Sequence, residues 1–301
     1  RSIIYGFNPP TTETKNKIIW SFMDKKVLTV QDISCFGQCS TTVALPILSA
    51  CGVETAIMPS AILSTHTGGF SGFTFRDLTE DLPKIMEHWK KEGINFDAIY
   101  TGYLGSKRQI EIVIDLFNNL LKEDGMRIVD PAMADNGKLY TGFGEDFVKE
   151  MRNLVGASDI VLPNMTEAAL LTDSEILLDN QSGEYIMSII YKLRDFGAKN
   201  IILKGIRNIE GKLGIAVFEG DTESIEIFYI DRIEKDAHGT GDCYAAAFTG
   251  GLMHGKSFRE AAKIAAEFVS EAITKTIDDD NHWYGVKFEK ALPVLVRELN
   301  K

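Results

Sequence analysis

The run from His238 to Asp242, with the sequence His-Gly-Thr-Gly-Asp, carries the clearest chemical signal in this 301-residue chain. It leads straight into a stretch of small, helix-forming residues that begins at Cys243. Two glycines allow a tight turn, so the amides at the helix start can converge on an anion that the helix dipole also favours. A carboxylate beside that anion could accept the proton of an attacking hydroxyl in phosphoryl transfer. The motif therefore predicts Asp242 as a catalytic base and an anion site made by Gly239, Thr240 and Gly241.

The same motif has a plain structural interpretation as well. An acidic residue in the first turn of a helix is favourable whether or not a ligand binds there. The motif alone therefore leaves both interpretations open, and the rest of the chain has to decide between them.

Polar residues also follow two predicted strands elsewhere in the chain. Asp130 comes directly after strand 127–129, and Asn164 and Glu167 follow strand 159–162. Ligands of open α/β sheets bind outside the carboxyl ends of the strands, so both groups should face one crevice. Carboxylates that act through water are typical of Mg²⁺-nucleotide sites. A plain helix cap explains either group alone, but two groups at consecutive strand ends favour a nucleotide site.

Two further segments could contact a substrate. Residues 60–75 are rich in Gly, Ser and Thr and include His66, Thr67 and Gly68. This stretch is either a solvated loop or a flap that closes over the substrate and excludes water. Tyr103 follows strand 98–100, where it could stack on a planar substrate or simply pack.

Residues 250–257 match the P-loop pattern G-x-x-x-x-G-K-[ST]. A P-loop must follow a buried strand and open a helix, whereas the residues before this match are small and helical. Gly255 suits a helix C-terminus, and Ser257 with Glu260 forms a capping box. We therefore expect a turn between two helices here.

The elements that must position these residues follow from the apolar pattern. Strands are predicted at residues 27–30, 55–58, 98–100, 127–129, 159–162, 201–203, 213–218 and 225–230. Helices are predicted at residues 42–50, 82–89, 109–121, 147–155, 185–196, 240–253, 258–274 and 288–299. Alternating strands and helices predict an α/β fold with a mainly parallel central sheet covered by helices on both faces. Residues 23–301 are expected to form a single domain, and residues 1–22 an N-terminal extension.

Composition narrows the possible partners. The formal net charge is −11 and there is no run rich in Lys or Arg, so a nucleic-acid partner is not expected. The apolar stretches near the N-terminus are short and separated by Pro9-Pro10, so neither a signal peptide nor a membrane span is expected. The cysteines lack zinc-site spacing. We expect a cytoplasmic protein.

Together these residues resemble the pyridoxal kinase branch of the ribokinase-like superfamily, over residues 26–276. The Gly-Thr-Gly-Asp run is shared by the whole superfamily, whereas the Ser-Thr-His-Thr flap and Gly-Tyr-Leu-Gly are more specific to B6-vitamer kinases. The resemblance is carried by Val30-Gln31-Asp32, Ser64 to Gly68, Gly102-Tyr103-Leu104-Gly105-Ser106, Val129-Asp130-Pro131, Leu162-Pro163-Asn164 with Glu167, Leu203-Lys204 and Gly239 to Asp242.

This resemblance implies transfer of the ATP γ-phosphate to the 5′-hydroxymethyl group of pyridoxal, pyridoxine or pyridoxamine in vitamin B6 salvage, with a β-flap over the substrate. Asp242 would be the base. The implied ATP-binding residues are Asp130, Leu162, Asn164, Glu167 and Lys204, with Asp130 and Glu167 holding Mg²⁺ through water. The implied vitamer pocket is Asp32, His66, Thr67, Gly68 and Tyr103. The resemblance also suggests a monovalent cation and a homodimer.

One departure from the family concerns Asp32, where the family commonly has Ser. A carboxylate there could pair with a protonated pyridine nitrogen or with the amine-bearing ring of a pyrimidine. The hydroxymethylpyrimidine kinases of thiamine synthesis, in the same superfamily, are therefore an alternative. A third alternative is a catalytically silent regulator that binds a vitamer or nucleotide. The intact Asp242 and the two acidic groups argue against it.

Overall fold

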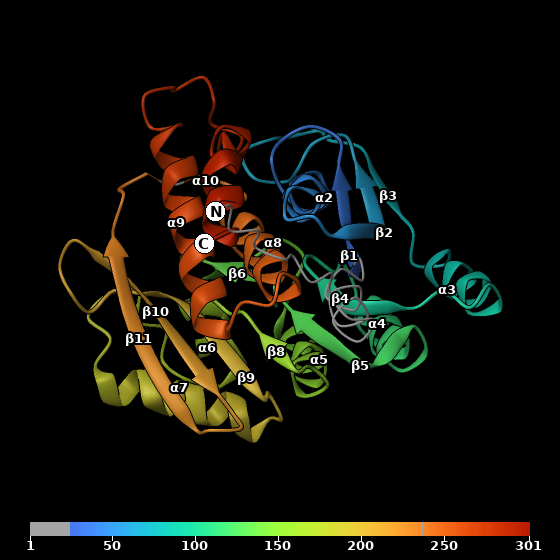
Figure 1. Cartoon of the computed structure of the whole chain (residues 1–301), viewed down its shortest axis with the longest axis horizontal. Helices are drawn as coiled ribbons and strands as arrows, with labels where there is room; N and C mark the ends of the chain where they lie inside the picture. The colour runs from blue at the N-terminus through green and yellow to red at the C-terminus, as the bar shows by residue number, and fades with distance from the viewer. Residues whose placement is uncertain (1–24, 236) are drawn as a thin grey trace, which may run out of the picture.

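The computed structural model describes residues 25–235 and 237–301, so the predicted N-terminal extension (1–22) lies outside the described residues. Nine strands form one sheet in the order β11-β10-β9-β8-β5-β4-β1-β2-β3 (Figure 1). Their bounds are β1 Lys26–Ser34, β2 Glu54–Leu63, β3 Phe75–Asp77, β4 Phe96–Thr101, β5 Leu121–Val129, β8 Ile160–Val161, β9 Asn200–Ile206, β10 Lys212–Glu219 and β11 Ser224–Asp231. A hairpin, β6 Ala134–Asp135 and β7 Lys138–Leu139, stands apart from this sheet.

The sheet is mainly parallel, as predicted. Strands β9, β8, β5, β4, β1 and β2 pair in parallel, and β3, β10 and β11 are antiparallel at the two edges. Central strands are covered by helices on both sides. This explains the run from Val27 to Val30, in which Val27, Leu28 and Val30 are fully buried.

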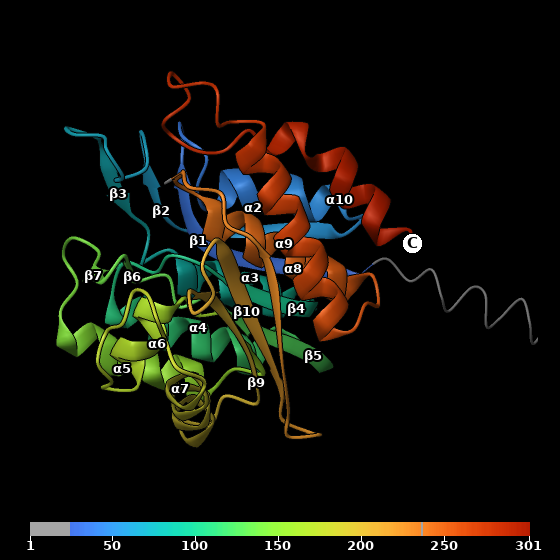
Figure 2. The ribbon, with the colours of Figure 1, turned by 90° about the vertical axis from the view of Figure 1, so that its left-hand side faces the viewer.

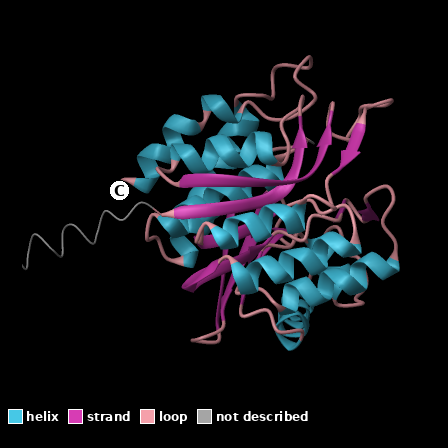
Figure 3. Cartoon of the chain, turned by 90° about the vertical axis from the view of Figure 1, so that its right-hand side faces the viewer, coloured by secondary structure: helices cyan, strands magenta, loops and turns pink. Residues whose placement is uncertain are grey.

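Helices cover both faces of the sheet (Figures 2 and 3). One face packs against α2 Thr41–Ala50, α8 Thr240–Met253, α9 Phe258–Thr274 and α10 Leu292–Leu299. The other packs against α3 Leu82–Lys91, α4 Lys107–Asn119, α5 Glu145–Gly156, α6 Met165–Leu171 and α7 Gly183–Asp195. Within residues 25–235 and 237–301, the helices are too short or too polar to cross a bilayer.

The carboxyl ends of the parallel strands meet along one edge of the sheet. Backbone bonds continue the pairing past the strand ends: the amide of Gly102 donates to Val30 O (3.2 Å) and that of Asp130 to Thr101 O (3.1 Å). The amide of Lys204 likewise donates to Pro163 O (2.9 Å). The segments that carry the predicted site residues are therefore held side by side by the sheet itself.

The predicted flap is more regular than a loop. β2 continues to Leu63, and β3 returns antiparallel to it with Leu63 opposite Phe75. The apolar residues Ala61 to Leu63 favour an extended strand over a solvated loop. We call residues 60–77 the flap.

Other differences from the predicted elements are local. The predicted helix 288–299 is divided into the 3₁₀ turn η1 (Phe288–Lys290) and α10. Pro293 lies at the start of α10, where its missing N–H costs nothing, whereas in the interior of one long helix it would remove a hydrogen bond and destabilise the helix. Residues 165–171, predicted only as a possible helix cap, form α6.

The P-loop match is a helix-helix junction, as predicted. Gly250 and Gly251 lie inside α8 and allow close packing: a Cβ on Gly250 would come within 2.4 Å of Cys51 Sγ. Gly255 follows the helix with φ +85, and Ser257 and Glu260 form the predicted capping box at the start of α9.

We expect Lys256→Ala to leave ATP affinity almost unchanged, because Lys256 lies in this turn and not at a strand end. Isothermal titration calorimetry of both proteins with Mg-ATP measures the effect. Lys204→Ala, which removes a cation at the carboxyl edge, is the positive control and should weaken binding. A large loss of affinity in a folded Lys256→Ala protein would show that the turn binds phosphate after all.

Candidate active site

The start of α8 is shaped by a glycine that no other residue could replace without strain. Gly239 has φ 75° and ψ 2°, in the left-handed region. The backbone of another loop also lies very close to its Cα. A Cβ on Gly239 would lie 1.8 Å from Gln38 O. The amides of the first helical turn, which include Thr240 and Gly241, have no partner inside the helix and can bind an anion.

Asp242, the predicted base, is in this first turn. Protein surrounds it on most sides, yet its side chain is partly exposed. Its Oδ2 accepts a hydrogen bond from the amide of Ser40 (2.9 Å), at the start of α2. Burial, with the negative charges of Asp130 and Asp32, raises the pKa of Asp242 to about 7, although the Ser40 bond and Lys204 oppose the rise. A carboxylate with this pKa is matched to proton transfer near neutral pH.

Asp130, which directly follows β5, forms an ion pair with Lys204, in the second half of β9. Lys204 Nζ lies 3.2 Å from Asp130 Oδ2, and both side chains are largely buried. Burial raises the pKa of Asp130 and Lys204 opposes that rise. Lys204 Nζ also lies 5.7 Å above the ring of Tyr244. The pair therefore offers a fixed cation at the crevice that a phosphate could share.

Asn164 and Glu167 form a full capping box at the start of α6. Glu167 Oε2 accepts from the amide of Asn164 (2.8 Å), and Asn164 Oδ1 accepts from the amide of Glu167 (2.9 Å). The helix-cap interpretation is therefore correct, and it does not exclude the nucleotide site. The neighbouring predicted residue, Leu162, is fully buried with its amide bonded to Val129 O, so its contact with ATP stays a prediction.

The residues present fit a Mg²⁺ ion that is held indirectly. Burial raises the pKa of Glu167, and the charge of Asp130 adds to the rise, so the two carboxylates share one region of low polarity. The part of the chain that the structure describes has no group of three His, Cys, Asp or Glu side chains arranged to ligate a metal. Glu167 already accepts two backbone amides, from Asn164 and Met133. Water and nucleotide phosphates would complete the coordination.

Asp32 and Tyr103 are the two predicted vitamer-pocket residues whose side-chain pKa values are raised. Asp32 is 4% exposed, and its Oδ2 accepts a hydrogen bond from Ser34 Oγ (2.8 Å). Burial raises the pKa of Asp32. Burial also raises the pKa of Tyr103, and the charge of Asp32 adds to that rise. The charge of Asp32 also contributes to the raised pKa of Asp242.

His66 organises the flap through both ring nitrogens. Its Nδ1 accepts from the amide of Gly68 (3.1 Å), and its Nε2 lies 2.9 Å from Tyr284 O, to which it donates. These partners select the neutral tautomer with its proton on Nε2, and burial lowers the pKa of His66. The ring nitrogens are thus occupied by protein, and the predicted substrate contact of His66 stays a prediction. Thr67, beside it, is exposed.

The flap rests against two segments that are distant in the sequence. A Cβ on Gly68 would lie 2.6 Å from His238 Cε1, and one on Gly69 would lie 2.8 Å from Trp283 Cζ3. Phe70 also packs on Trp283, with ring centroids 4.5 Å apart. The contacts of Ser40 and Trp283, and that of His238 with Gly68, could not be predicted from the sequence, because each joins segments that are far apart in the chain.

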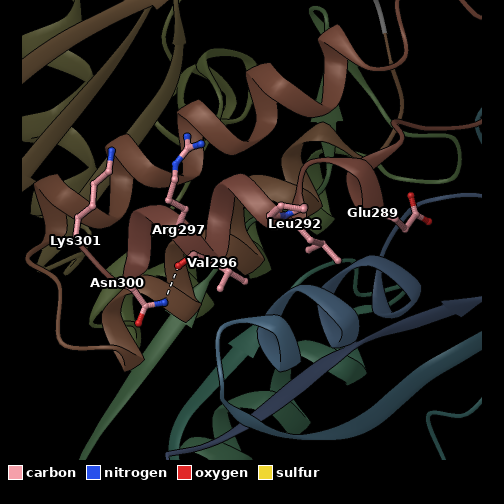
Figure 4. Close-up of a pocket in the computed structure, with 7 residues that line it drawn as sticks. Glu289, Leu292, Val296, Arg297, Asn300 and Lys301 are labelled. Atoms are coloured by element: carbon pink, nitrogen blue, oxygen red, sulfur yellow. Dashed lines mark hydrogen bonds between the residues drawn. The ribbon is translucent and has the colours of Figure 1, made fainter.

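A separate groove runs along α10, away from these residues (Figure 4). Neither the base, the Asp130–Lys204 pair nor the flap lines it. Its lining residues are Glu289, Leu292, Pro293, Val296, Arg297, Asn300 and Lys301.

This arrangement, with the start of a helix, a base, an ion pair and a flap at the carboxyl edge of a mainly parallel sheet, defines a ribokinase-like small-molecule kinase. Residues 47–286 match the phosphomethylpyrimidine kinase family, and the chain belongs to that family. The fold class and the kinase activity predicted from the sequence are therefore confirmed.

Individual relatives narrow the class. A Bacteroides thetaiotaomicron protein described as a phosphomethylpyrimidine kinase and crystallised with pyridoxal is 36% identical, with a TM-score of 0.86 over 91% of this chain and 96% of the other. Pyridoxal kinase from Lactobacillus plantarum is 29% identical, with a TM-score of 0.82 over 91% and 97% of the two chains. Hydroxymethylpyrimidine/phosphomethylpyrimidine kinase of Bacillus subtilis is 29% identical over 74% of this chain and 78% of its own length. The resemblance to the pyridoxal kinase branch is confirmed.

Proposed function

We propose that this protein phosphorylates the 5′-hydroxymethyl group of a B6 vitamer with Mg-ATP, in vitamin B6 salvage. The observation that carries the proposal is the setting of Asp242. It is in the first turn of α8, beside the proposed anion site, it accepts the amide of Ser40, and the charge of Asp32 from the proposed vitamer pocket contributes to its raised pKa. The similarity to a protein crystallised with pyridoxal supports a pyridine ring as the occupant of that pocket.

On the donor side, the ATP phosphates would lie along the edge formed by Asp130, Asn164, Glu167 and Lys204. Lys204 neutralises phosphate charge, and the free amides of the first turn of α8 stabilise the transferring phosphoryl group. When bound, Mg²⁺ supplies further neutralisation of the phosphate oxygens, with Asp130 and Glu167 holding its water ligands.

On the acceptor side, Asp242 removes the proton of the substrate hydroxyl. The Ser40 amide holds the carboxylate in place, and its pKa of about 7 leaves a large ionised fraction at neutral pH. The hydroxyl oxygen then bonds to the γ-phosphorus as the bond to the bridging oxygen breaks. The products are the vitamer 5′-phosphate, ADP and the proton on Asp242.

Three predictions about the setting of the reaction remain predictions. They are the homodimer, the monovalent cation and the cytoplasmic location. Each describes the setting of the reaction and not the chemistry of the site, so none of the steps above depends on it.

A hydroxymethylpyrimidine is the alternative substrate, and Asp32 is the observation that favours it. A buried carboxylate needs a cationic or hydrogen-bonding partner. Within the described residues the hydroxyl of Ser34 bonds to it and the side chain of Ser40 also lowers its pKa, but neither serine is a cation, so a cationic ring substrate could supply the missing charge. A protonated pyridine nitrogen and an aminopyrimidine would both serve.

An ADP-release assay with pyridoxal, pyridoxine, pyridoxamine and hydroxymethylpyrimidine separates the two functions. We expect the highest kcat/KM with a B6 vitamer. A clear preference for hydroxymethylpyrimidine would replace the proposal by the alternative, and turnover of none of the four would contradict both. The Asp242→Asn protein, purified in parallel, controls for contaminating kinases.

We expect Asp32→Ser to retain pyridoxal phosphorylation, to change the ratios of kcat/KM among the vitamers, and to lower any pyrimidine activity. Serine restores the residue common in the family and removes the charge that favours a protonated ring. Asp32→Asn is the matched control, because it removes the charge but keeps the size. Unchanged substrate ratios with only a lower Tm would return Asp32 to a structural role.

A further inference from the structure

The segment 133–143, which we call the hairpin segment, is tied at its first residues to the nucleotide side of the crevice. The amide of Met133 donates to Glu167 Oε1 (3.3 Å), and Asn164 Nδ2 donates to Ala134 O (2.9 Å). The amide of Gly137 donates to Thr166 Oγ1 (3.0 Å). Three bonds therefore join the segment to the first turn of α6, which carries two of the predicted ATP-binding residues.

The hairpin itself is a stiff connection. β6 and β7 are joined by Asn136 and Gly137, both with positive φ (47 and 78), as a tight two-residue hairpin turn requires. The amide of Tyr140 closes the hairpin by donating to Met133 O (2.8 Å). Although 39% of Tyr140 is exposed, burial and the negative charge of Glu167 raise the pKa of its hydroxyl.

The last residue of the segment, Phe143, touches the other half of the site. Its amide donates to Tyr140 O (3.1 Å), so its position follows the hairpin. Its ring stacks on Tyr103, with centroids 5.5 Å apart and planes at 25°. On its other side it stacks on Phe147, with centroids 3.9 Å apart and planes at 2°. Phe147 is 6% exposed and belongs to the core under α5, so it fixes the far end of this ladder of rings.

From these contacts we infer that the hairpin segment couples nucleotide binding to vitamer binding, with Phe143 as the positioning residue for Tyr103. The inference rests on the proposed function, since it takes Glu167 and Asn164 as the nucleotide side and Tyr103 as the ring wall. A nucleotide that bonds to the start of α6 restrains Met133 and Ala134. The hairpin transmits that restraint to Phe143, which holds the Tyr103 ring for the vitamer. Coupling of this kind is reciprocal, so the vitamer tightens nucleotide binding by the same factor.

The test is a thermodynamic cycle by calorimetry on the whole chain. The Kd of the ring substrate is measured with and without a non-hydrolysable ATP analogue and Mg²⁺, and the ring substrate is the one with the highest kcat/KM in the assay above. We expect the wild-type Kd to fall about fivefold or more when the analogue is present, within the usual range of coupling between sites. In Phe143→Leu the ratio should approach one, while the Kd of the analogue alone stays unchanged.

Two variants make the result specific. Phe143→Tyr keeps the aromatic ring and should restore the coupling. Phe196→Leu changes a partly exposed phenylalanine at the end of α7, outside the site, and should leave the coupling as in the wild type. Equal coupling in Phe143→Leu and wild type, with only a lower Tm, would show that the ladder is packing and would overturn the inference, as would a wild type without coupling. A wild type that binds none of the ring substrates would instead refute the proposed function.

Discussion

Asp242→Asn should lower turnover by roughly two orders of magnitude or more, the usual loss for a missing general base. Asparagine has the same shape, and its oxygen can still accept the Ser40 amide, so the fold and the ATP affinity should persist. The amide cannot accept the proton of the hydroxyl. Steady-state kinetics give kcat, and calorimetry gives the Kd of ATP. Turnover close to the wild-type value would refute the assignment of the base.

The raised pKa of Asp242 adds a second readout. In the free enzyme the carboxylate must be ionised to act, so kcat/KM should rise with pH and level off above about 7, and this rise should be absent from Asp242→Asn. The pKa of Asp242 is raised in the folded protein, so the folded state binds the proton more tightly than the unfolded state does. The free energy of unfolding therefore falls as the pH rises from the unfolded pKa of 3.8 to the folded pKa of about 7. The variant should therefore be more stable than the wild type at pH 8, an ordinary trade between stability and activity.

Gly239→Ala should cost about 2 kcal/mol or more of unfolding free energy and most of the activity. The left-handed conformation is unfavourable for alanine by about 1–2 kcal/mol, and the new Cβ would meet Gln38 O at 1.8 Å. To relieve that contact the turn must shift, which displaces the first-turn amides and Asp242. Urea denaturation measures the free energy, and the kinase assay measures the activity.

Gly241→Ala is the matched control, two residues further along the same motif. Gly241 has ordinary helical backbone, and apart from its chain neighbours and the backbone of its own helix turn, no atom of the described residues lies within 4 Å of a Cβ built there. Replacing a glycine in a helix by alanine usually gains about 0.5–1 kcal/mol. The Gly241→Ala protein should therefore be at least as stable as the wild type. Equal losses of unfolding free energy in the two variants would contradict the role of the Gln38 contact.

Much of the fold could be predicted, because its signals are local. Buried parallel strands such as 98–100 need continuous apolar runs. Helices such as 258–274 need an apolar residue every three to four positions, which together form one apolar face. Each element can therefore be identified from its own residues. The rule that ligands bind at the carboxyl ends of strands then predicted that Asp130 lies near Asn164 and Glu167. The P-loop match was rejected for a local reason as well, since the capping residues Ser257 and Glu260 mark the start of a helix.

What could not be predicted depends on contacts between distant segments. The bond from Ser40 to Asp242 joins residues 202 positions apart, and nothing near Ser40 indicates its partner. The packing of Trp283 on the flap is of the same kind. The β3 strand was missed because three residues are too few for a periodic pattern, and only its pairing with Leu63 makes it a strand.

The contact between Trp283 and the flap also gives the protein an intrinsic optical probe. The indole is 47% exposed, and it touches Phe70 and lies beside Gly69. Trp89, the other tryptophan in the described residues, packs against the core near Phe96, on the far side of the sheet from the helices that flank Trp283. Any change in the distance between the flap and residues 282–284 alters the polarity around one indole and leaves the other untouched. The emission maximum of Trp283 therefore reports the position of the flap in solution, without any attached dye.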